Sequence, residues 1–598
     1  MHRHLFSLHQ YGCRAVEEHE GFTARHVAQK RSEGGAVRLA PLCDRERRDE
    51  AGTGSLPVRG VRGVAARRSD QALGRMEGNP MCGIVAVWQE EDPELTRHIM
   101  EGLTHRGPDA SGLASWRRAS LGHRRLSIMD PEGGRQPIKN EDGSAAIVAN
   151  GEIYNFRELK SELLPGQRFR TSSDSEVPLH LYERLGCDMV TKLDGMFAFA
   201  LTDGRELFAA RDPVGIKPLY YGRSGHRTVF ASELKALSGR VADVKEFPPG
   251  NYFHTQTGLR EYRQLPRAEP EDLPVHEWRQ LIRETLERSI TKRLMSDVPL
   301  GAFLSGGLDS SIIAAVARRH LRELHTFSVG IKGSRDLKAA RLVAKHIDSI
   351  HHEYTLTPEE IERELPFVVY HLESFDSDLV RSAVPCHFVS RLASKHVKVI
   401  LTGEGADELF GGYAYHSDYA TTGMLEGELH RSVSSLHNIN LQRVDRLTMA
   451  HSIEGRVPFL DLQMIELAQQ IPSELKIRRL DNGTQIEKWI LRKAFEDLLP
   501  PEIVWRTKEQ FDDGSGTSDL LAGMASRFMP EDTAGEYAAA YRSDRIRGHE
   551  EAVYHKLLCD SYVDPSIVLA NVGRWNQDRV GLTDLEGASG SGRGRQAL

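Results

Sequence analysis

Residues 305–311 read Ser-Gly-Gly-Leu-Asp-Ser-Ser, and they join two segments of different character. The apolar residues 298–304 before them are typical of a buried strand, and the helical pattern of residues 310–321 follows directly. A further strand is expected at residues 324–329. Strand, helix and strand with connections this short predict a parallel sheet with crossover helices.

The glycine turn has the features of an anion site. Backbone amides at a glycine-rich turn and at a helix N-terminus point at one spot and favour negative charge. Asp309 would repel a phosphate there unless a cation lay between them, and Mg²⁺ prefers oxygen ligands and bridges phosphates. The ending Gly-Lys-Ser/Thr of a Walker loop is absent from the turn. The turn therefore predicts a nucleotide site with Mg²⁺, and a plain serine-capped helix is the alternative.

A second glycine turn follows another expected strand. Residues 401–408 read Leu-Thr-Gly-Glu-Gly-Ala-Asp-Glu, at the end of a strand expected at residues 398–401. Loops at the carboxyl ends of parallel strands line one crevice, so both turns should face the same nucleotide. Asp407 then becomes a second Mg²⁺ ligand beside Asp309, and a solvated acidic loop is the alternative.

The part of the chain before residue 265 alternates short strands and turns. An apolar run at 145–149 ends in Asn150-Gly151, a dipeptide that most often marks a hairpin turn. Residues 195–201 are apolar at every position, which is typical of a strand covered on both faces. The pattern predicts a layered α+β domain.

Composition and charge exclude several classes of protein. The net charge of -7 argues against general affinity for nucleic acid, and no apolar run reaches the length of a membrane span. The six cysteines are scattered without a Cys-x-x-Cys pair, which favours neither a zinc site nor a disulfide framework. We therefore expect a cytoplasmic protein. A homodimer is compatible with the sequence.

Four segments in order carry a resemblance to the class II glutamine amidotransferases. They are Cys82 in the apolar run 81–88, Thr-His-Arg-Gly-Pro-Asp at 104–109, Arg-Leu-Ser-Ile at 125–128 and Asn-Gly-Glu-Ile-Tyr-Asn at 150–155. The first glycine turn, at 305–311, resembles the pyrophosphate loop of the N-type ATP pyrophosphatases. Together, from Cys82 to about Phe511, the chain resembles glutamine-hydrolysing asparagine synthetases of the bacterial B type.

The resemblance implies a two-domain protein of mixed α/β and α+β class. Residues 82–265 would form a class II glutamine amidotransferase domain, an αββα sandwich like that of the Ntn hydrolases. Residues 270–575 would form the ATP-dependent synthetase domain, a doubly wound parallel sheet with extra helices. Residues 1–81 are expected to be a disordered extension, either a start placed upstream of the true initiator Met81 or a segment that is removed. Residues 581–598 are expected to be a flexible tail.

The resemblance also assigns roles in glutamine hydrolysis. The Cys82 thiolate would attack the side-chain amide of glutamine, with the α-amine of the same cysteine as its base. An amide nitrogen has no such basicity, so a retained extension would leave an enzyme that uses only ammonia. Asn150 and the Gly151 amide would form the oxyanion hole. The carboxylate and amino group of glutamine would be held by Arg125, Glu152 and Asp174.

In the synthetase half, the resemblance implies that aspartate attacks ATP to give a β-aspartyl adenylate and pyrophosphate. Lys508, in the motif 505–511, would stabilise charge at the α-phosphate, and Glu404 would deprotonate the incoming amine. A solvated lysine is the alternative for Lys508. The residues implied to bind ATP are Phe303, Ser305, Gly306, Gly307, Asp309, Ser310, Val329 and Gly403.

The acceptor end departs from the family pattern. Arg381, implied to bind aspartate, is retained, but Asp378 and Leu379 stand where the family has two threonines. The alternative function is therefore a natural-product amidotransferase that amidates another carboxylate. A β-lactam synthetase-like cyclising enzyme is disfavoured because those relatives typically lack the nucleophile at Cys82. A scaffold without catalysis is disfavoured by the intact acidic and basic motifs.

Overall fold

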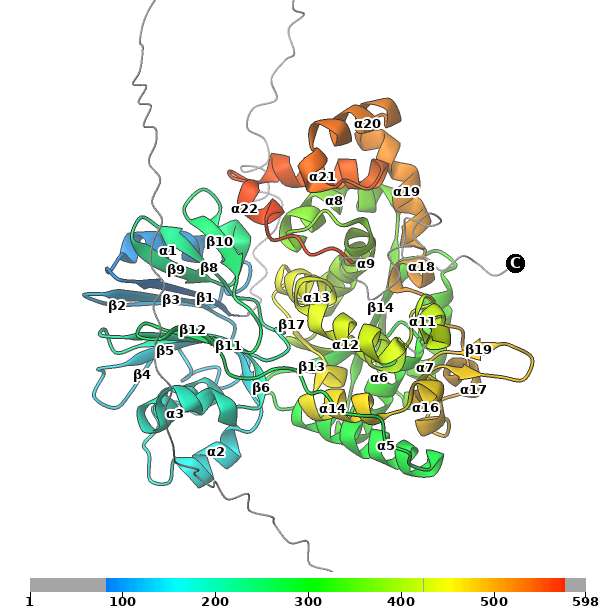
Figure 1. Ribbon diagram of the computed structural model, residues 1–598, viewed down its shortest axis with the longest axis horizontal. Coiled ribbons are helices and arrows are strands. Elements are labelled where there is room, and N and C mark those ends of the chain that lie inside the picture. The colour runs from blue at the N-terminus through cyan, green and yellow to red at the C-terminus, as the bar shows by residue number, and fades with distance from the viewer. Residues whose placement is uncertain (1–81, 423, 576–598) are drawn as a thin grey trace, which may run out of the picture. The chain divides into compact units, whose positions relative to one another are not determined.

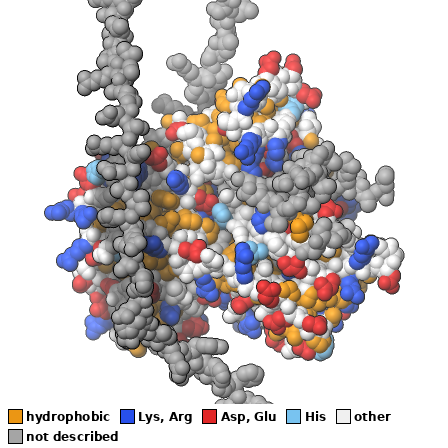
Figure 2. All heavy atoms as spheres, in the orientation of Figure 1, with side chains coloured by type: hydrophobic (Ala, Val, Ile, Leu, Met, Phe, Trp, Pro, Cys, Tyr) orange, Lys and Arg blue, Asp and Glu red, His pale blue; other side chains and the backbone are white. Residues whose placement is uncertain are grey.

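The computed structural model describes residues 82–422 and 424–575 (Figure 1). The predicted extension at 1–81 and the predicted tail at 581–598 lie outside the described residues. Within the described part, no helix is both long enough and apolar enough to cross a membrane. Figure 2 shows acidic and basic side chains interspersed over the visible face, in keeping with 78 basic and 85 acidic residues in the sequence.

Two antiparallel sheets form the amino-terminal half. The first has the strand order β10-β8-β9-β1-β3-β2, and the second has the order β12-β11-β7-β6-β5-β4. The strands of the first are β1 (Gly83–Trp88), β2 (Ala110–Trp116), β3 (Ala119–Arg125), β8 (Tyr220–Ser224), β9 (Arg227–Ala231) and β10 (Ala242–Glu246). Those of the second are β4 (Ile138–Lys139), β5 (Ala146–Ile153), β6 (Gly195–Thr202), β7 (Leu207–Arg211), β11 (Asn251–His254) and β12 (Gly258–Glu261).

The two sheets pack face to face between helices. Successive side chains of a strand point to opposite faces, so Ile84 of β1 packs in one buried cluster with Val148 of the second sheet. Val85, on the outer face, belongs to the cluster that contains Ile99 of α1 (Pro93–Glu101). Helices α2 (Phe156–Leu163) and α3 (Val177–Leu185) cover the outer face of the second sheet (Figure 1). This arrangement confirms the predicted αββα sandwich.

The carboxyl-terminal half is built on a five-stranded parallel sheet of order β15-β14-β13-β16-β17. Its strands are β13 (Leu300–Phe303), β14 (His325–Ile331), β15 (Ile350–Leu356), β16 (Val399–Leu401) and β17 (Glu454–Arg456). The chain moves from β13 to one edge and then returns to the other side, so the order reverses between β13 and β16. Such a reversal leaves a crevice at the carboxyl ends of the strands.

Helices cover both faces of this sheet, which confirms the predicted doubly wound fold. One core cluster joins Leu300 to α5 (Val275–Lys292), α6 (Leu308–His320) and α7 (Arg335–Ile347). Another joins Phe327 to α8 (Pro358–Leu372) and α9 (Ser377–Ala393). The remaining elements are α4 (Leu234–Leu237), α10 (Ala406–Phe410), α11 (His416–Thr422), α12 (Leu425–Ser435), α13 (Asn440–Met449), α14 (Leu462–Gln470), α15 (Ser473–Lys476), β18 (Arg478–Arg479), β19 (Gln485–Ile486), α16 (Trp489–Ala494), α17 (Pro501–Val504), α18 (Phe511–Ser515), α19 (Thr517–Phe528), α20 (Glu531–Ala540), α21 (His549–Ser561) and α22 (Ser566–Leu569).

One local prediction was wrong. Asn150 and Gly151 do not form a hairpin turn but lie within β5, where Gly151 pairs with Phe197 of β6. Gly151 has a φ of +128°, a conformation that favours glycine, so the dipeptide marks a local distortion of a long strand. The same signal serves a turn or a bent strand, because both need a residue that accepts positive φ.

Buried ion pairs join the two halves. Arg106, which is fully buried, donates hydrogen bonds to Glu233 at 2.5 Å and to Asp445 at 2.7 and 3.1 Å. Asp445 belongs to α13 in the carboxyl-terminal half. The Arg106 Nε also donates to the backbone carbonyl of Cys82 at 3.1 Å. A single side chain thus connects the start of β1 to the other half of the protein.

We expect Arg106→Ala to lower the free energy of unfolding by about 3–5 kcal/mol, because it removes a buried cation from two buried carboxylates, Glu233 and Asp445. Urea unfolding followed by tryptophan fluorescence measures the change. Arg97→Ala, on the exposed side of α1, is the control and should change the free energy by less than about 0.5 kcal/mol. Equal effects of the two variants would contradict this role of Arg106.

Candidate functional site

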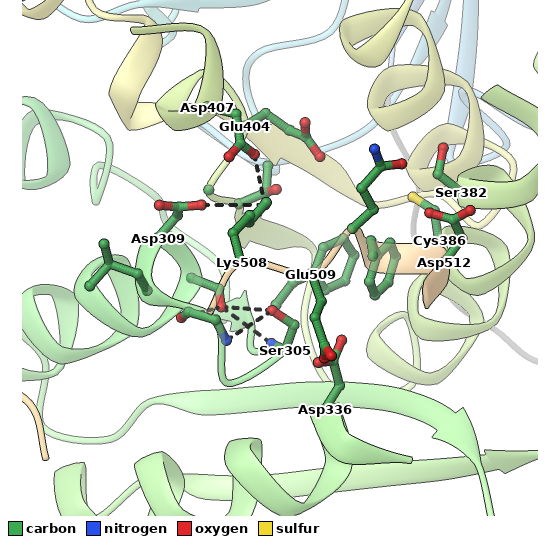
Figure 3. A pocket seen from close by; sticks show the side chains of 18 of the residues that line it. Ser305, Asp309, Asp336, Ser382, Cys386, Glu404, Asp407, Lys508, Glu509 and Asp512 are labelled. Carbon is green, nitrogen blue, oxygen red and sulfur yellow. Dashed lines mark hydrogen bonds and ion pairs between the residues drawn. The ribbon is translucent and has the colours of Figure 1, made fainter. Parts of the chain in front are cut away.

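A large cavity lies at the carboxyl ends of β13, β14 and β16, where the strand order reverses (Figure 3). Seven of the eight residues predicted to hold ATP line it: Phe303, Ser305, Gly307, Asp309, Ser310, Val329 and Gly403. Gly306 is not among the lining residues. It has a φ of +74° and packs so closely on Ala339 that a Cβ would clash, so its part is to shape the turn.

Two lysines lie beside the acidic residues of the glycine turns. Lys488 Nζ is 2.7 Å from Asp309 Oδ2 and 2.5 Å from Asp407 Oδ1, and its side chain is 1% exposed. Lys508 Nζ is 2.8 Å from Asp407 Oδ2 and 3.9 Å from Asp309 Oδ2 (Figure 3). The sequence analysis missed Lys488. It is a single lysine without a motif, and only the fold brings it to this position.

The lysines set the charge of this end of the cavity. Burial alone would raise the pKa of Asp407, but Lys488 and Lys508 hold that pKa well below its ordinary value. Burial would likewise lower the pKa of Lys508, but Asp407 and then Asp309 hold it above its usual range. Asp407 and Lys508 therefore carry charge at neutral pH, and the cavity offers an ammonium group to an anionic ligand.

The fit to Mg²⁺ differs between the two predicted ligands. Asp309 Oδ1 is buried without a hydrogen-bond partner among the described residues, so one carboxylate oxygen is free for a cation. Both oxygens of Asp407 already contact lysine ammonium groups. The donor set therefore suits a cation at Asp309, whereas Asp407 would first have to separate from a lysine.

The two remaining predicted residues at this end are held by charged partners. Glu404 lines the cavity and forms an ion pair with Arg443, which also lines it. Arg381 is not among the lining residues, and its guanidinium pairs with Glu550 and lies 3.6 Å from Asp378. Arg381 was expected to bind the carboxylate of a substrate. In the structure its guanidinium instead contacts two carboxylates of the chain itself. Asp378 does line the cavity.

A second, smaller pocket lies in the amino-terminal half. Its lining includes all six residues predicted for glutamine hydrolysis: Cys82, Arg125, Asn150, Gly151, Glu152 and Asp174. They come from the residue before β1, from β3 and β5 and from the turn before α3, which lie far apart in sequence. The structure thus brings the whole predicted set to one place.

The thiol in this pocket needs a base. Burial raises the pKa of Cys82 to about 12, although a hydrogen bond from its Sγ to the Leu126 carbonyl, at 3.7 Å, and the charge of Arg125 lower it. Within the described part of the chain, no titratable side chain forms a hydrogen bond with Sγ. The thiol by itself would therefore be protonated and unreactive at neutral pH.

Polar groups surround the thiol. Arg125 is oriented by hydrogen bonds to the carbonyls of Pro131 and Asp130, at 2.9 and 2.6 Å. Both side-chain polar atoms of Asn150 are buried without a hydrogen-bond partner among the described residues. An unpaired buried amide is costly, so Asn150 is preorganised for a ligand rather than for the fold.

The carboxylates in the pocket are strongly perturbed. Burial raises the pKa of Asp174 to about 6, against a hydrogen bond of 2.6 Å from the Ile153 amide. Burial and the neighbouring Asp174 raise the pKa of Glu152 well above its ordinary value, while Arg456, at 3.1 Å, lowers it. A cationic group of a ligand would favour the charged form of both carboxylates.

Comparison with known proteins covers both halves. A family model described as glutamine amidotransferase domain matches residues 81–267, and one described as asparagine synthase matches residues 281–426 and 418–550. Asparagine synthetase (glutamine-hydrolysing) 2 of Oryza sativa subsp. japonica is 44% identical over 509 residues, 81% of this chain and 85% of the relative. The glutamine-hydrolysing asparagine synthetase of Zea mays is 43% identical over 80% of this chain and 86% of its own length. Asparagine synthetase (glutamine-hydrolysing) 3 of Arabidopsis thaliana is 42% identical over 82% and 89%, respectively.

Removal of the Lys488 ammonium should turn the acidic pair into a stronger cation site. In Lys488→Met, Asp309 and Asp407 would face each other with less compensation, so Mg²⁺ should raise the melting temperature more than it does in the wild type. Thermal unfolding with and without Mg²⁺ measures this. Lys493→Met removes a partly exposed lysine of α16 and should respond like the wild type. An equal response of Lys488→Met and the wild type to Mg²⁺ would contradict the expectation.

Proposed function

The chain belongs to the glutamine-hydrolysing asparagine synthetase family, and from this premise we propose that it makes asparagine with glutamine as the nitrogen donor. The reaction is L-aspartate, L-glutamine, ATP and water to L-asparagine, L-glutamate, AMP and diphosphate, through a β-aspartyl adenylate. The observation that carries the proposal is the pair of pockets, one with a cysteine, an unpaired amide and two carboxylates, the other with two glycine turns and two lysines.

Glutamine hydrolysis belongs to the smaller pocket. Arg125 would bind the carboxylate of glutamine, and Glu152 and Asp174 would bind its ammonium group. The Cys82 thiolate attacks the amide carbon, and Asn150 with the Gly151 amide stabilises the oxyanion. Ammonia leaves, and water hydrolyses the resulting thioester to glutamate. The raised pKa of the thiol makes the base essential, and a free α-amine on Cys82, with a pKa of about 8, suits that role.

Adenylate formation belongs to the larger cavity. The β-carboxylate of aspartate attacks the α-phosphorus of ATP, and diphosphate leaves. Lys508 and Lys488 would stabilise the negative charge that develops on the phosphates. Ammonia then attacks the adenylate carbonyl, the bond from that carbon to the phosphate oxygen breaks, and AMP leaves. Glu404, oriented by its ion pair with Arg443, would take the proton of the incoming ammonia.

Asp309 would hold Mg²⁺ through its unpaired oxygen, and the ion would supply positive charge that offsets the negative charge of the diphosphate. Asp407 would join this set only after separation from a lysine.

Domain limits at 265 and 270, a cytoplasmic location, a homodimer and removal of residues 1–81 stay predictions.

The acceptor proposed is aspartate. The similarity to proteins named asparagine synthetases over most of the chain favours it over another carboxylate. Asp378 in the cavity wall is compatible with aspartate, since its carboxylate can face the ammonium group of the substrate. Arg381 would reach the substrate only after release from Glu550. Parallel assays of other carboxylic acids, with diphosphate release as the readout, test the alternative acceptor.

We expect Cys82→Ala to lose asparagine formation from glutamine and to keep it from ammonium salts, because only the smaller pocket uses the thiol. Chromatography of asparagine and AMP measures both activities. Cys187→Ala, a partly buried cysteine of the same half, is the control and should keep both. Asparagine formation from glutamine by Cys82→Ala would contradict the assignment.

The N-terminus of the purified protein belongs to the same test. Intact mass and terminal sequencing tell whether Cys82 is the first residue. A wild type that begins at Cys82 should use glutamine, whereas one that retains residues 1–81 should use only ammonia. Use of glutamine by the longer chain would overturn the role of the α-amine.

The pH dependence should report Asp174. Its carboxyl has a pKa of about 6 in the free pocket, so below that pH it loses the charge that would bind the ammonium group of glutamine. We expect kcat/KM for glutamine to fall up to tenfold per pH unit below about 6. Asp174→Asn should lower kcat/KM and remove this acidic limb, whereas Asp188→Asn, at an exposed position, should keep it. An unchanged acidic limb in Asp174→Asn would assign it to another group.

A further inference from the structure

Three histidines meet near the amino-terminal ends of two strands of the parallel sheet, at the end of the sheet opposite the large cavity. His325 is the first residue of β14, His352 lies in β15, and His396 lies in the turn between α9 and β16. One nitrogen of each lies within 4.8 Å of one nitrogen of each of the others. Because all five strands are parallel, this position near the start of β14 and β15 is remote from the carboxyl ends that form the cavity.

Strand register brings the rings to one face. His352 pairs with Phe327, and His325 stands two residues before Phe327, so all three side chains project from the same side of the sheet. Helix α9 packs on β14 and β15, and His396 follows the end of that helix. The ring centroids of His352 and His396 are 3.9 Å apart, and those of His325 and His352 are 5.2 Å apart.

The pKa values of two of the three imidazoles are lowered. Among the described residues, no ion pair joins any of the three histidines to a carboxylate. Burial, followed by the neighbouring His396 and His325, lowers the pKa of His352 to about 4. Burial, His325 and Lys395 lower that of His396. Neutral imidazole nitrogens are the form that ligates transition metals.

The contact between His325 and His352 already has nearly the spacing of a metal site. His325 Nδ1 and His352 Nε2 are 3.0 Å apart and share one proton in a hydrogen bond. Two histidine nitrogens on a tetrahedral Zn²⁺ would be about 3.3 Å apart, given Zn–N distances of about 2.0–2.1 Å. A metal ion in place of that proton therefore requires little movement of these two strands.

We propose that His325, His352 and His396 form a binding site for a divalent transition metal of the Zn²⁺ class, with water as the fourth ligand. Imidazole ligands select Zn²⁺, Co²⁺, Ni²⁺ and Cu²⁺ over Mg²⁺, so this site is chemically distinct from the nucleotide cavity. His396 is the exposed member. Its ring stacks on that of His352, and it would turn from the stack to direct a nitrogen at the ion. The ion would tie β14 and β15 to the turn before β16.

Co²⁺ is the probe, because tetrahedral Co²⁺ has intense visible d–d bands that hexaaqua Co²⁺ lacks. The full-length protein, without a polyhistidine tag and stripped with a chelator, is titrated with Co²⁺ and then with Zn²⁺. We expect tetrahedral bands that saturate at one Co²⁺ per chain and disappear when Zn²⁺ displaces it. Zn²⁺ should also raise the melting temperature, since the site links three separate segments.

His396→Gln is the decisive variant, because it removes a ligand on the surface and should fold normally. It should weaken Co²⁺ binding at least tenfold and abolish the increase in melting temperature. His352→Gln should do the same. His226→Gln, whose side chain is 67% exposed and remote from the cluster in sequence, should bind like the wild type. Absence of tetrahedral bands in the wild type, or binding by His396→Gln equal to that of the wild type, would overturn the proposal and leave an aromatic stack.

Discussion

Both pockets depend on the hydrogen bonds and ion pairs of one buried residue, Arg456. It donates to the backbone carbonyls of Arg293 and Met295 at 2.7 and 2.5 Å, and it pairs with Glu152 at 3.1 Å. Its own carbonyl accepts a hydrogen bond from the amide of Thr402 at 3.0 Å. One residue of β17 therefore holds a carboxylate of the small pocket on its side chain and the second glycine turn of the large cavity on its backbone.

Much of the fold follows from local sequence signals. The run at 195–201 is apolar at every position because β6 is covered by the other sheet on one face and by helices on the other. The strand, glycine turn and helix around residues 305–311 predicted the parallel sheet. A helix that connects two strands with short turns places those strands parallel in one sheet. The signal at Asn150-Gly151 failed, because positive φ is needed equally by a turn and by a distorted strand.

The site was predictable where residues form motifs and not where they act singly. Five of the six residues of the small pocket lie in the quoted motifs, Asp174 was implied by the resemblance alone, and all six line that pocket. Lys488 has no such motif, and it reaches Asp309 only because the chain returns 179 residues later. Arg381 lies where the resemblance predicts an arginine, but the sequence did not predict its ion pair with Glu550 of the distant helix α21. Long-range charge pairing is a property of the fold and leaves no local pattern in the sequence.

The connection through β17 also has a consequence for how such chains can be recombined. The linker near residue 270 looks like a natural point at which to exchange one half for that of a homologue. Such an exchange would separate Glu152 and Arg106 from the partners with which they were selected, Arg456 and Asp445. Neither half is therefore an independent unit for exchange. The residues that form the ion pairs between the halves would have to be exchanged together.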